Sequence, residues 1–382
     1  MRFIHTSDLH IGKLLEGWDL SEDTDYVLDQ LVDIAVKEKA DCVVIAGDVF
    51  DRSVASEDCL VKYDLLLKRL CIDHGIKVLA IAGNHDSGER LAANNLLLEL
   101  SGLYYVVGRP TETIKKVTLK DEYGPVNFYL LPFFTPNDIK KFFNPEVSKY
   151  TDDSAFRDLM AHQEIDTSQR NVLVAHLFAA GFTPSGSEFG LSDVAGVGNI
   201  AIDRFKDFDY VALGHIHQPQ QVSRPTLRYS GSLLKYKISE VKRQEKSVCV
   251  VDLGPKGDVK VETVPIKPLH PLREVTDSFD NLIKGAPDKD SFVFVHLTDQ
   301  QMISNAASRL DSVFPHLVSL NYVNLTFANP DAPTEVAGIS PLEMIQDFYR
   351  SRHGNTKDLS PEQLEVLKDI LADIGKQTEE GK

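Results

Sequence analysis

The chain has 382 residues, a formal net charge of −16, and 42% hydrophobic and 26% charged residues. This composition is that of a soluble globular protein, and the length predicts two or three domains rather than one compact core. No apolar run is long enough to cross a bilayer, which argues against a membrane protein. The acidic balance argues against a protein that grips nucleic acid by overall charge, because phosphate binding needs clustered Lys and Arg. A nucleic-acid enzyme is still compatible with it, since bound divalent metals would invert the charge locally and a basic partner could hold the polymer.

The N-terminus and the cysteines both predict a cytoplasmic protein. Residues Met1 to His5 enter a strand pattern at once, without the basic region and longer apolar stretch of a signal peptide. We expect the cysteines to be reduced core thiols, and their spacing excludes a cysteine-based zinc site. The four cysteines, none of them in a CxxC spacing, are Cys42, Cys59, Cys71 and Cys249.

The first 82 residues alternate predicted strands and helices. The β-branched run 42–46 is typical of a strand that is buried on both faces. One helix is predicted to begin at Ser21, with acidic residues in its first turn, and another at Ser56. Each has apolar residues on one face. A further strand is predicted at 77–82. Strands and helices in this order indicate right-handed crossovers in a largely parallel sheet.

The middle of the chain contains shorter predicted elements. A helix is predicted at 91–100, and the polar segment 132–167 is predicted to be loop and helix over the functional site. Residues 178–199 form a predicted long loop, which in a compact domain is usually functional or mobile. Short strands are predicted near 104–107, 114–119 and 126–131, and antiparallel pairs among 227–229, 247–253 and 259–264 with 254–257 as a turn.

A domain boundary is predicted near Pro265–Pro271. Beyond it, the pattern predicts strand 292–297, helix 300–313 and strand 318–327, which together indicate a small α+β unit. A second predicted linker covers 329–333.

Two predicted helices follow this linker. Each opens on a capping box with Pro at the first helical position and has one apolar face. The boxes are Ser340-Pro341-Leu342-Glu343 and Ser360-Pro361-Glu362-Gln363, and the apolar faces are Leu342, Ile345 and Tyr349, then Leu364, Leu367, Leu371 and Ile374.

Asp48 stands where the buried strand at 42–46 stops, after a turn at Gly47. Ligands collect at the carboxyl ends of strands in open α/β sheets. On its own, Asp48 is better explained as a residue that caps the next turn or helix. The same arrangement recurs, however, in four other segments that end in Asp, Asn or His, namely 4–10, 78–86, 172–176 and 210–217.

These segments contain the side chains that a metal site needs. In an extended chain, residues two apart point the same way, so both side chains of Asp8-x-His10 and of His215-x-His217 can reach one ion. Asn84 offers a neutral oxygen ligand, whereas its neighbour His85 would point elsewhere and could act on a substrate. Each motif alone is outweighed by a turn cap or a packed histidine.

Taken together, the ligands are too many for one ion and suit two. A shared carboxylate would hold two metals roughly 3.5–4 Å apart, the separation used for in-line phosphoryl displacement. Mixed oxygen and imidazole ligands favour Mn²⁺ or Fe over Mg²⁺ or structural Zn²⁺. The predicted ligands are Asp8, His10, Asp48, Asn84, His176, His215 and His217.

The order Asp-x-His, Gly-Asp, Gly-Asn-His-Asp, a lone His and Gly-His-x-His resembles the signature of the calcineurin-like metallophosphoesterases. Any one motif is weak, but all five in this order are highly specific. Within that family the sequence is most similar to the bacterial SbcD-type nuclease subunits. The stretches that carry this closer likeness are 5–12, 47–52, 83–91, 213–220 and 228–232.

The resemblance implies a fold and a division into domains. The fold would be α/β, a metallophosphoesterase sheet sandwich flanked by helices, with a small α+β capping domain and C-terminal helices. Residues 1–268 would form the nuclease domain and 269–330 a domain that contacts DNA. Residues 331–382 would form a linker and two helices that dock an ATPase partner.

The resemblance also implies a role for each site residue. The first metal would be held by Asp8, His10 and His217. The second would be held by Asn84, His176 and His215, with Asp48 bridging the two. His85 would contact the scissile phosphate and aid departure of the leaving group.

Members of this branch cut DNA ends and hairpins, as exonucleases and endonucleases, with two divalent metal ions, most often Mn²⁺. They act in DNA repair, recombination and replication, under the control of an SbcC-type ATPase with a long coiled coil. Their subunits pair through helices of the phosphoesterase domain, so the resemblance implies a homodimer within a heterotetramer.

One position departs from the wider family. Eukaryotic and archaeal relatives carry a histidine just after the Gly-Asp-x-Phe motif, where this chain has Asp51 followed by Arg52. A second catalytic histidine is therefore not expected there. Arg52 is a candidate phosphate contact, although a salt bridge to a nearby carboxylate explains it equally well, and Arg90 is a further candidate substrate contact.

Two rival functions are compatible with the motifs. The first is another phosphoesterase, such as a protein phosphatase or a cyclic-nucleotide phosphodiesterase, and the second is a non-catalytic scaffold of the same fold. The extra α+β unit and terminal helices argue for a polymeric substrate and a partner, and the complete ligand set argues against a scaffold. The terminal helices could alternatively pack on the protein's own core.

Overall fold

The computed structural model describes residues 1–146, 148–184, 199–243, 245–285, 287–324 and 358–368, together with 342, 345, 346 and 349. The chain divides into two compact units, Met1–Leu325 and Thr326–Lys382. Within the described residues, no helix combines the length and the apolarity that crossing a bilayer requires.

The first unit is built on two six-stranded sheets. The first sheet has four parallel strands, β1, β4, β5 and β6, and an antiparallel pair at one side, in the order β14 (Val259–Pro265), β13 (Ser247–Leu253), β1 (Arg2–Thr6), β4 (Cys42–Ala46), β5 (Lys77–Ile81) and β6 (Tyr104–Val107). The second sheet has four parallel strands between two antiparallel edges, in the order β11 (Gln220–Val222), β12 (Arg224–Tyr229), β10 (Tyr210–Gly214), β9 (Arg170–His176), β8 (Gly124–Leu131) and β7 (Lys115–Asp121).

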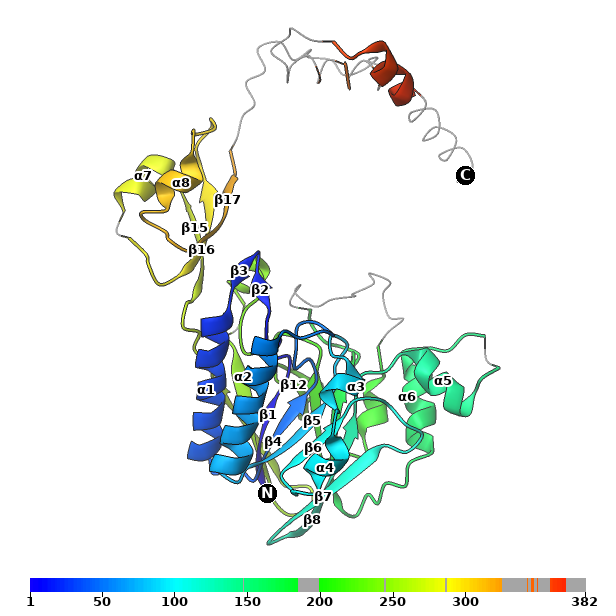
Figure 1. The fold of residues 1–382 in the computed structure, drawn as a ribbon. Coiled ribbons are helices and arrows are strands. Elements are labelled where there is room, and N and C mark those ends of the chain that lie inside the picture. Colours follow the sequence, from blue (N-terminus) through cyan, green and yellow to red (C-terminus); the bar gives the residue numbers. More distant parts are fainter. Residues whose placement is uncertain are drawn as a thin grey trace. The chain divides into compact units, whose positions relative to one another are not determined.

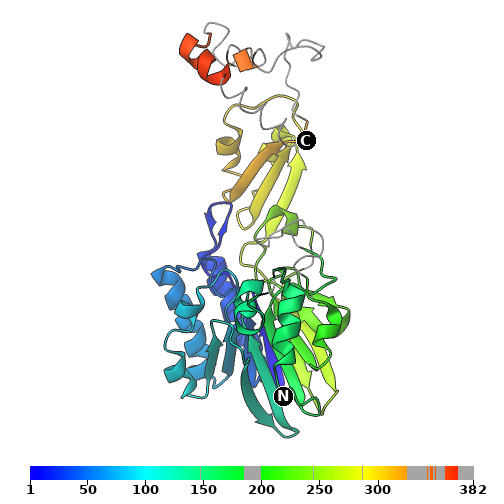
Figure 2. The same ribbon diagram turned by 90° about the vertical axis from the view of Figure 1, so that its right-hand side faces the viewer.

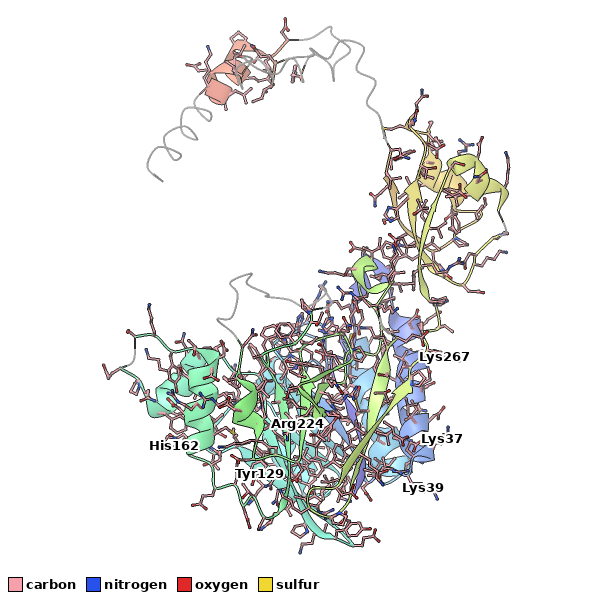
Figure 3. All side chains as sticks on the ribbon, turned by 180° about the vertical axis from the view of Figure 1, so that it is seen from behind. Lys37, Lys39, Tyr129, His162, Arg224 and Lys267 are labelled. Atoms are coloured by element: carbon pink, nitrogen blue, oxygen red, sulfur yellow. The ribbon has the colours of Figure 1, made fainter. Side chains whose placement is uncertain are left out.

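The two sheets pack face to face through an apolar layer that includes Phe3, Val44, Phe128 and Tyr210. Helices α1 (Ser21–Lys37) and α2 (Glu57–Leu67) cover the outer face of the first sheet. Helices α5 (Pro136–Phe143) and α6 (Asp152–Ala161) cover the second. Figures 1 and 2 show these helices on opposite flanks of the strands, and Figure 3 shows that side chains fill the spaces between the layers. The predicted sheet sandwich flanked by helices is confirmed, and β4 is buried along its whole length as predicted.

Several local predictions are confirmed and others are corrected. Helix α1 begins at Ser21, and Ser56 caps α2 by accepting a hydrogen bond from Cys59 N. The helix predicted at 91–100 is instead two short helices, α3 (Gly88–Leu91) and α4 (Asn95–Glu99), because Asn94 between them has a left-handed φ of 60°. A π-helical turn, η1 (Lys68–Asp73), extends α2.

One prediction about strand pairing was wrong, and the prediction for the segment 132–167 was correct only in part. Strand β13 pairs antiparallel with β14 as predicted, but β12 belongs to the other sheet, where it runs parallel to β10. The connection after β12 crosses from one sheet to the other, which no local pattern indicates. The segment 132–167 is loop and helix as predicted, and the Phe133 ring lies 6.2 Å from the rings of His176 and His215, but Phe156 and Leu159 of α6 pack on the outer face of the second sheet.

A third sheet follows, with three parallel strands. It contains β15 (Leu272–Asp277), β16 (Phe292–Leu297) and β17 (Leu317–Tyr322), with helices α7 (Phe279–Lys284) and α8 (Ala306–Leu310). The predicted strand at 292–297 is present, and the one predicted at 318–327 ends at Tyr322, whereas 325–327 lie outside the described residues. The helix predicted at 300–313 shrinks to α8, which begins after Asn305 in a left-handed conformation.

The small sheet contacts the larger domain near the start of the chain. The indole of Trp18, in the short hairpin β2 (Leu14–Leu15) and β3 (Trp18–Asp19), lies 5.9 Å from the Phe292 ring. His270 donates its backbone N–H to Asp23 of α1. Both contacts join the small sheet to the segment that follows β1.

In the second unit, residues 361–368 are helical. Ser360 Oγ accepts a hydrogen bond from Gln363 N, and Ser360 N donates to Gln363 Oε1, so the second predicted capping box is confirmed. Ser340, Pro341 and Glu343 of the first box, and the apolar positions Leu371 and Ile374, lie outside the described residues, as does most of the loop predicted at 178–199.

Candidate metal centre

All seven predicted ligands meet at one edge of the sandwich, where the parallel strands of both sheets end. Each follows or ends a strand: Asp8 and His10 follow β1, Asp48 follows β4, Asn84 follows β5, His176 ends β9, and His215 and His217 follow β10. Six of them are buried and Asn84 is partly buried. The structure therefore brings together residues that are up to 209 positions apart in the sequence.

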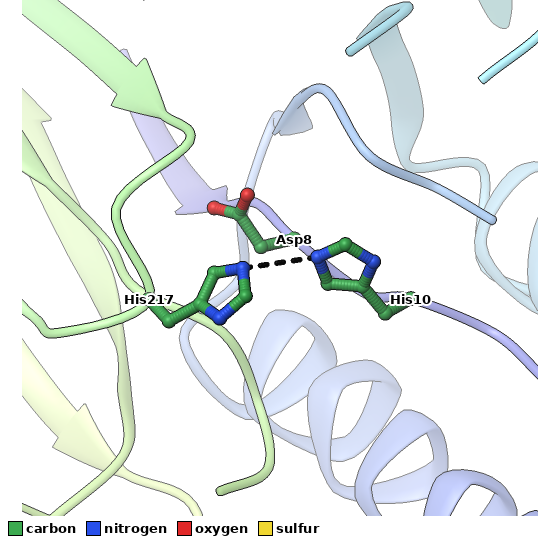
Figure 4. A group of neighbouring side chains, drawn as sticks. All are labelled: Asp8, His10 and His217. Atoms are coloured by element: carbon green, nitrogen blue, oxygen red, sulfur yellow. Dashed lines mark hydrogen bonds between the residues drawn. The ribbon is translucent and has the colours of Figure 1, made fainter. Parts of the chain in front are cut away.

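Asp8, His10 and His217 form one group, in which one ligand atom from each lies within 4.8 Å of the others. The Nε2 atoms of His10 and His217 face each other across 3.0 Å (Figure 4). The carboxylate of Asp8 accepts hydrogen bonds from Ser7 Oγ and from the backbone N–H of His215. We call this group the first triad.

Asp48, His176 and His215 form a second group with the same spacing, the second triad. Nδ1 of His215 lies 3.1 Å from Nε2 of His176, and Oδ1 of Asn84 lies 3.0 Å from that same Nε2. Oδ2 of Asp48 is 3.5 Å from His176 Nε2 and 3.6 Å from His10 Nε2. The Asp48 carboxylate thus lies between the two triads.

The backbone at the site is not extended, contrary to the argument from alternation. Asp8, His10 and Asp48 have φ values of 52°, 44° and 52°, and His215 has 96°. Residues other than glycine rarely adopt this left-handed region, and such strain persists only where the surroundings impose it. The Asp8 and His10 side chains therefore converge through left-handed turns rather than through alternation along a strand.

Hydrogen bonds between neighbouring loops impose these turns. Asp8 N donates to the carbonyl of Gly47, and His10 N donates to the carbonyl of Asp48, at 2.9 and 3.0 Å. Asp86 accepts backbone hydrogen bonds from Val49, Phe50 and Gly83 on the neighbouring loops. The sequence pattern assigns no role to Asp86, the last residue of the Gly-Asn-His-Asp motif, whereas in the structure it joins the loops that carry Asp48 and Asn84.

Glycines allow backbone segments to approach closely at the site, both between the two sheets and within the first sheet. A Cβ atom on Gly214 would lie 1.9 Å from the carbonyl oxygen of Ala46, and one on Gly83 would lie 2.1 Å from Oδ1 of Asp48. Since neither neighbour is the end of a flexible side chain in open space, these positions accept only glycine without a shift of the backbone.

The donor set fits divalent cations. The site buries two carboxylates, and no ion pair among the described residues joins Asp8 or Asp48 to a Lys or Arg. Buried charges need a partner, which histidines provide only when protonated. Carboxylate and amide oxygens with four imidazoles form the mixed ligand set that first-row divalent metals bind.

Burial and neighbouring charges shift the pKa values of these side chains in different directions, as expected of groups that share cations. Burial raises the pKa of Asp8. Burial also favours neutral Asp48, but His176 and His10 beside it hold the pKa of that carboxyl below its usual range. Burial opposes protonation of His176, yet the charge of Asp48 raises its pKa to about 9, while burial and the charge of His176 lower the pKa of His215 to about 3.

His85 lies beside both triads. Its backbone N–H donates to Oδ1 of Asp48 at 2.9 Å, and its Nδ1 donates to the carbonyl of Asp51 at 2.8 Å. Its ring is 4.8 Å from the ring of His10, edge to face. The His85 side chain therefore sits next to the first triad.

The two arginine candidates lie near His85. The Arg52 side chain is 75% exposed, with Nε 3.9 Å from Oδ2 of Asp51, which is a weak ion pair. Arg90 donates to the carbonyl of Ser53 at 3.5 Å. Arg52 lies in the loop after β4 and Arg90 in the short helix α3.

Sequence reasoning missed the buried residues that contact the backbone and the rings of the site histidines. Lys246 Nζ donates to the backbone carbonyl of His217 at 2.6 Å and is paired with Glu240, and both side chains are almost fully buried. Tyr236 donates to the carbonyl of Leu9 and packs against the rings of His10 and His217. The only signal in the sequence was their position just after the stretch 228–232.

Comparisons with known proteins place the chain in a family. The family model described as calcineurin-like phosphoesterase matches residues 1–219, and the one described as type 5 capsule protein repressor C-terminal domain matches 268–353. The SbcD component of the SbcCD nuclease of Staphylococcus epidermidis is 29% identical over 380 residues, covering 98% of this chain and 99% of that one. The crystal structure of TT1561 of Thermus thermophilus is 16% identical, with a TM-score of 0.40, and covers 70% of this chain and 99% of that chain. The predicted likeness to SbcD-type subunits is confirmed, and the chain belongs to the calcineurin-like phosphoesterase family.

Proposed function

We propose that the chain is a metal-dependent DNA nuclease subunit of the SbcD type, which hydrolyses phosphodiester bonds at DNA ends and hairpins. The observation that carries this proposal is the placement of Asp48 between two triads, with His85 bonded to it. Two adjacent cation sites with a shared carboxylate suit in-line displacement at phosphorus. The full-length likeness to a nuclease subunit supports DNA as the substrate.

In this proposal each ligand has a defined role. Asp8, His10 and His217 hold the first divalent ion. Asn84, His176 and His215 hold the second, and Asp48 contacts both; Mn²⁺ suits this oxygen and imidazole set. When bound, such ions supply water of lowered pKa and neutralise phosphate charge.

His85 acts on the leaving group. Its Nδ1 proton is committed to the Asp51 carbonyl, since a carbonyl oxygen can only accept. Nε2 is therefore the nitrogen that contacts the scissile phosphate, and when the ring carries a proton on both nitrogens, Nε2 delivers its proton to the departing oxygen and the ring is left neutral. General acid catalysis of this kind contributes on the order of 10²–10⁴-fold.

The His85→Gln variant tests this role. It should retain both metals, since His85 is in neither triad, and should lose cleavage by at least about 100-fold. Cleavage of duplex, single-stranded and hairpin DNA would be measured with Mn²⁺ or Mg²⁺, with and without the ATPase partner. Cleavage at the wild-type rate would contradict the assignment of His85.

Assays on the same purified protein would distinguish a nuclease from the alternative functions. A phosphatase or cyclic-nucleotide phosphodiesterase would hydrolyse phosphomonoesters or cyclic nucleotides in preference to DNA, and a scaffold would hydrolyse none of them. The match of residues 268–353 to a second family model, beyond the phosphoesterase region, favours a polymeric substrate. Residues 269–330 would then contact DNA, with Arg52 and Arg90 binding phosphates beside the site.

Partners follow from the same proposal. The C-terminal helices would dock an SbcC-type coiled-coil ATPase, and Val366 in the described part of the last helix is exposed. Two copies would pair through the phosphoesterase helices, where Leu60 and Leu65 of α2 and Leu96 and Leu97 of α4 are exposed. The resulting heterotetramer would act on DNA in the cytoplasm, in repair and recombination.

A pull-down of the ATPase with and without residues 340–382 tests the docking. Loss of capture on truncation, with metal binding retained, is the expected result. If the terminal helices packed instead on the protein's own core, truncation would lower the melting temperature and leave capture intact.

A further inference from the structure

Asp51 lies three residues after Asp48, and the proposed function gives its side chain no role. It follows Phe50, which forms a parallel bridge with Ile11, and its own backbone N–H donates to the Ile11 carbonyl at 3.2 Å. The loop after Asp48 is thereby fixed to the loop after His10. The Asp51 side chain is 13% exposed, and its carboxylate lies beside the Nδ1 side of the His10 ring in the first triad.

The Asp51 carboxylate has two basic neighbours. Lys13 Nζ forms a salt bridge with Oδ1 at 2.6 Å, and Nδ1 of His10 lies 3.5 Å from the same oxygen. His10 is buried, and in the described part of the chain its Nδ1 has no hydrogen-bond partner. The carboxylate held by Lys13 is therefore the acceptor that the Nδ1 proton of His10 faces.

The opposite ring nitrogen of His10 faces the cation site. Nε2 is 3.0 Å from Nε2 of His217 and 3.6 Å from Oδ2 of Asp48. A histidine that binds a metal through Nε2 keeps its proton on Nδ1, and a carboxylate near that proton fixes the tautomer and raises the basicity of Nε2. Asp51 stands where such a carboxylate is needed.

The backbone of Asp51 serves a second histidine. Its carbonyl oxygen accepts the 2.8 Å hydrogen bond from Nδ1 of His85, which fixes the tautomer of His85 as well. The two rings lie edge to face with centroids 4.8 Å apart. One residue thus orients two imidazoles, one with its side chain and one with its main chain.

The second triad is oriented differently. Nδ1 of His176 donates to the backbone carbonyl of Ala46 at 2.8 Å, and no substitution of a side chain removes that acceptor. The first triad depends on a carboxylate that substitution can remove. This difference makes the contribution of Asp51 measurable at one cation site against the other.

We propose that Asp51 is a positioning residue, held by Lys13, that aligns His10 for the first divalent cation and His85 for the leaving group. The inference rests on the proposed function, because it assigns His10 to a metal and His85 to the phosphate.

Titration of the full-length protein with Mn²⁺ alone tests the proposal, by calorimetry and by electron paramagnetic resonance of bound Mn²⁺. The Asp51→Asn variant should bind one of two Mn²⁺ ions about 10-fold more weakly and the other with unchanged affinity. Lys13→Met should weaken the same ion by a smaller factor. Asp33→Asn, an exposed carboxylate on α1 away from both triads, is the matched control and should leave both affinities unchanged.

Cleavage gives a second measurement of the same effect. The Mn²⁺ concentration for half-maximal DNA cleavage should rise in Asp51→Asn by the factor found for binding. The rate at saturating Mn²⁺ should fall much less, since the bond to His85 comes from the main chain. Asp51→Glu, which restores the charge, should recover part of the affinity.

The outcomes are distinguishable. Wild-type protein that binds no Mn²⁺ would contradict the proposed function itself. Two wild-type Mn²⁺ affinities in a folded Asp51→Asn variant, or equal weakening of both ions, would overturn the role of Asp51. If Asp51→Asn fails to melt cooperatively, Lys13→Met decides, because it removes the anchor of the carboxylate and leaves Asp51 in place.

Discussion

The two six-stranded sheets contribute different chemistry to the same edge of the sandwich. The first sheet supplies every oxygen ligand, Asp8, Asp48 and Asn84, and only one imidazole, whereas the second sheet supplies imidazoles alone. Neither sheet holds a complete triad. The candidate centre therefore forms only when the sheets pack in one register, and its stability is tied to the apolar layer between them.

Contacts at both edges of the sandwich hold that register. At the edge with the site, Lys246, just before β13 of the first sheet, donates to the carbonyl of His217 from the second. At the opposite edge, Arg170 of β9 in the second sheet donates to the carbonyl of Leu253 in the first and pairs with Asp121. The two edges differ in that only the first carries ligands.

Replacing Asp48 with Ala should give the largest effect, because this carboxylate of the first sheet lies within 3.6 Å of ring nitrogens from both sheets. We expect weakened or lost binding of both divalent ions and a loss of cleavage on the order of 10³-fold. Mn²⁺ titration and DNA cleavage would measure this. Asp33→Ala, an exposed position on α1, is the control, and one tightly bound ion left in Asp48→Ala would contradict the bridging role.

The seven ligand positions were predictable because each ends a strand, and a strand end is a local feature of sequence. The contribution of each sheet was not predictable, because sheet membership depends on where the chain crosses over. Residues 228–253 illustrate this, since their pattern shows β-strands but not that β12 and β13 lie in different sheets. The left-handed turns at Asp8 and His10 were also missed, because hydrogen bonds from a distant loop impose them.

Breaking the Glu240–Lys246 pair tests the contact at the site edge. Glu240→Ala should destabilise the fold by about 3–5 kcal/mol, since removal of one partner leaves a buried lysine charge uncompensated. Urea unfolding measures the loss, and Glu245→Ala, an exposed neighbour, is the matched control. A variant as stable as the control would show that Lys246 is satisfied by His217 and Ser232 alone.

Gly214→Ala tests how closely the sheets must approach. The added methyl would lie 1.9 Å from the carbonyl oxygen of Ala46 in β4, so the sheets must separate locally. We expect destabilisation of about 3 kcal/mol, together with weaker binding of the ion at the second triad. Gly75→Ala, with open space around it but a left-handed φ of 66°, should cost about 1 kcal/mol and leave metal binding unchanged. Equal losses in both variants would argue against a sheet-contact effect.

The small third sheet shows where sequence patterns are weakest. Strand β15 and helix α7 were missed because both elements are short and most of their residues are half-exposed. In α7, Phe279 and Leu282 are too few apolar positions to define a helical period. The helix predicted at 300–313 was too long because a left-handed Asn305 divides it. Strand β16 was predicted correctly because five of its six residues are buried and apolar.

Asp121→Asn tests the edge without ligands and should have the smallest effect. The Arg170 guanidinium holds the pKa of the Asp121 carboxyl well below its usual range, against a smaller opposing effect of burial. A carboxyl with a lowered folded pKa stabilises the fold above its unfolded pKa of 3.8, and this stabilisation is lost as the pH falls towards the folded value.

The loss of stability in Asp121→Asn at pH 7 should be about 1–2 kcal/mol, less than for Glu240→Ala, because Arg170 keeps its bonds to the carbonyls of Gly124, Leu253 and Gly254. Unfolding curves of wild type and variant should therefore differ at pH 7 and begin to converge only below about pH 4, while the exposed Glu122→Gln follows wild type throughout. Mn²⁺ affinity should be unchanged in Asp121→Asn, since the first and second triads lie at the other edge; a loss of affinity equal to that in Gly214→Ala would mean that the two edges do not act independently.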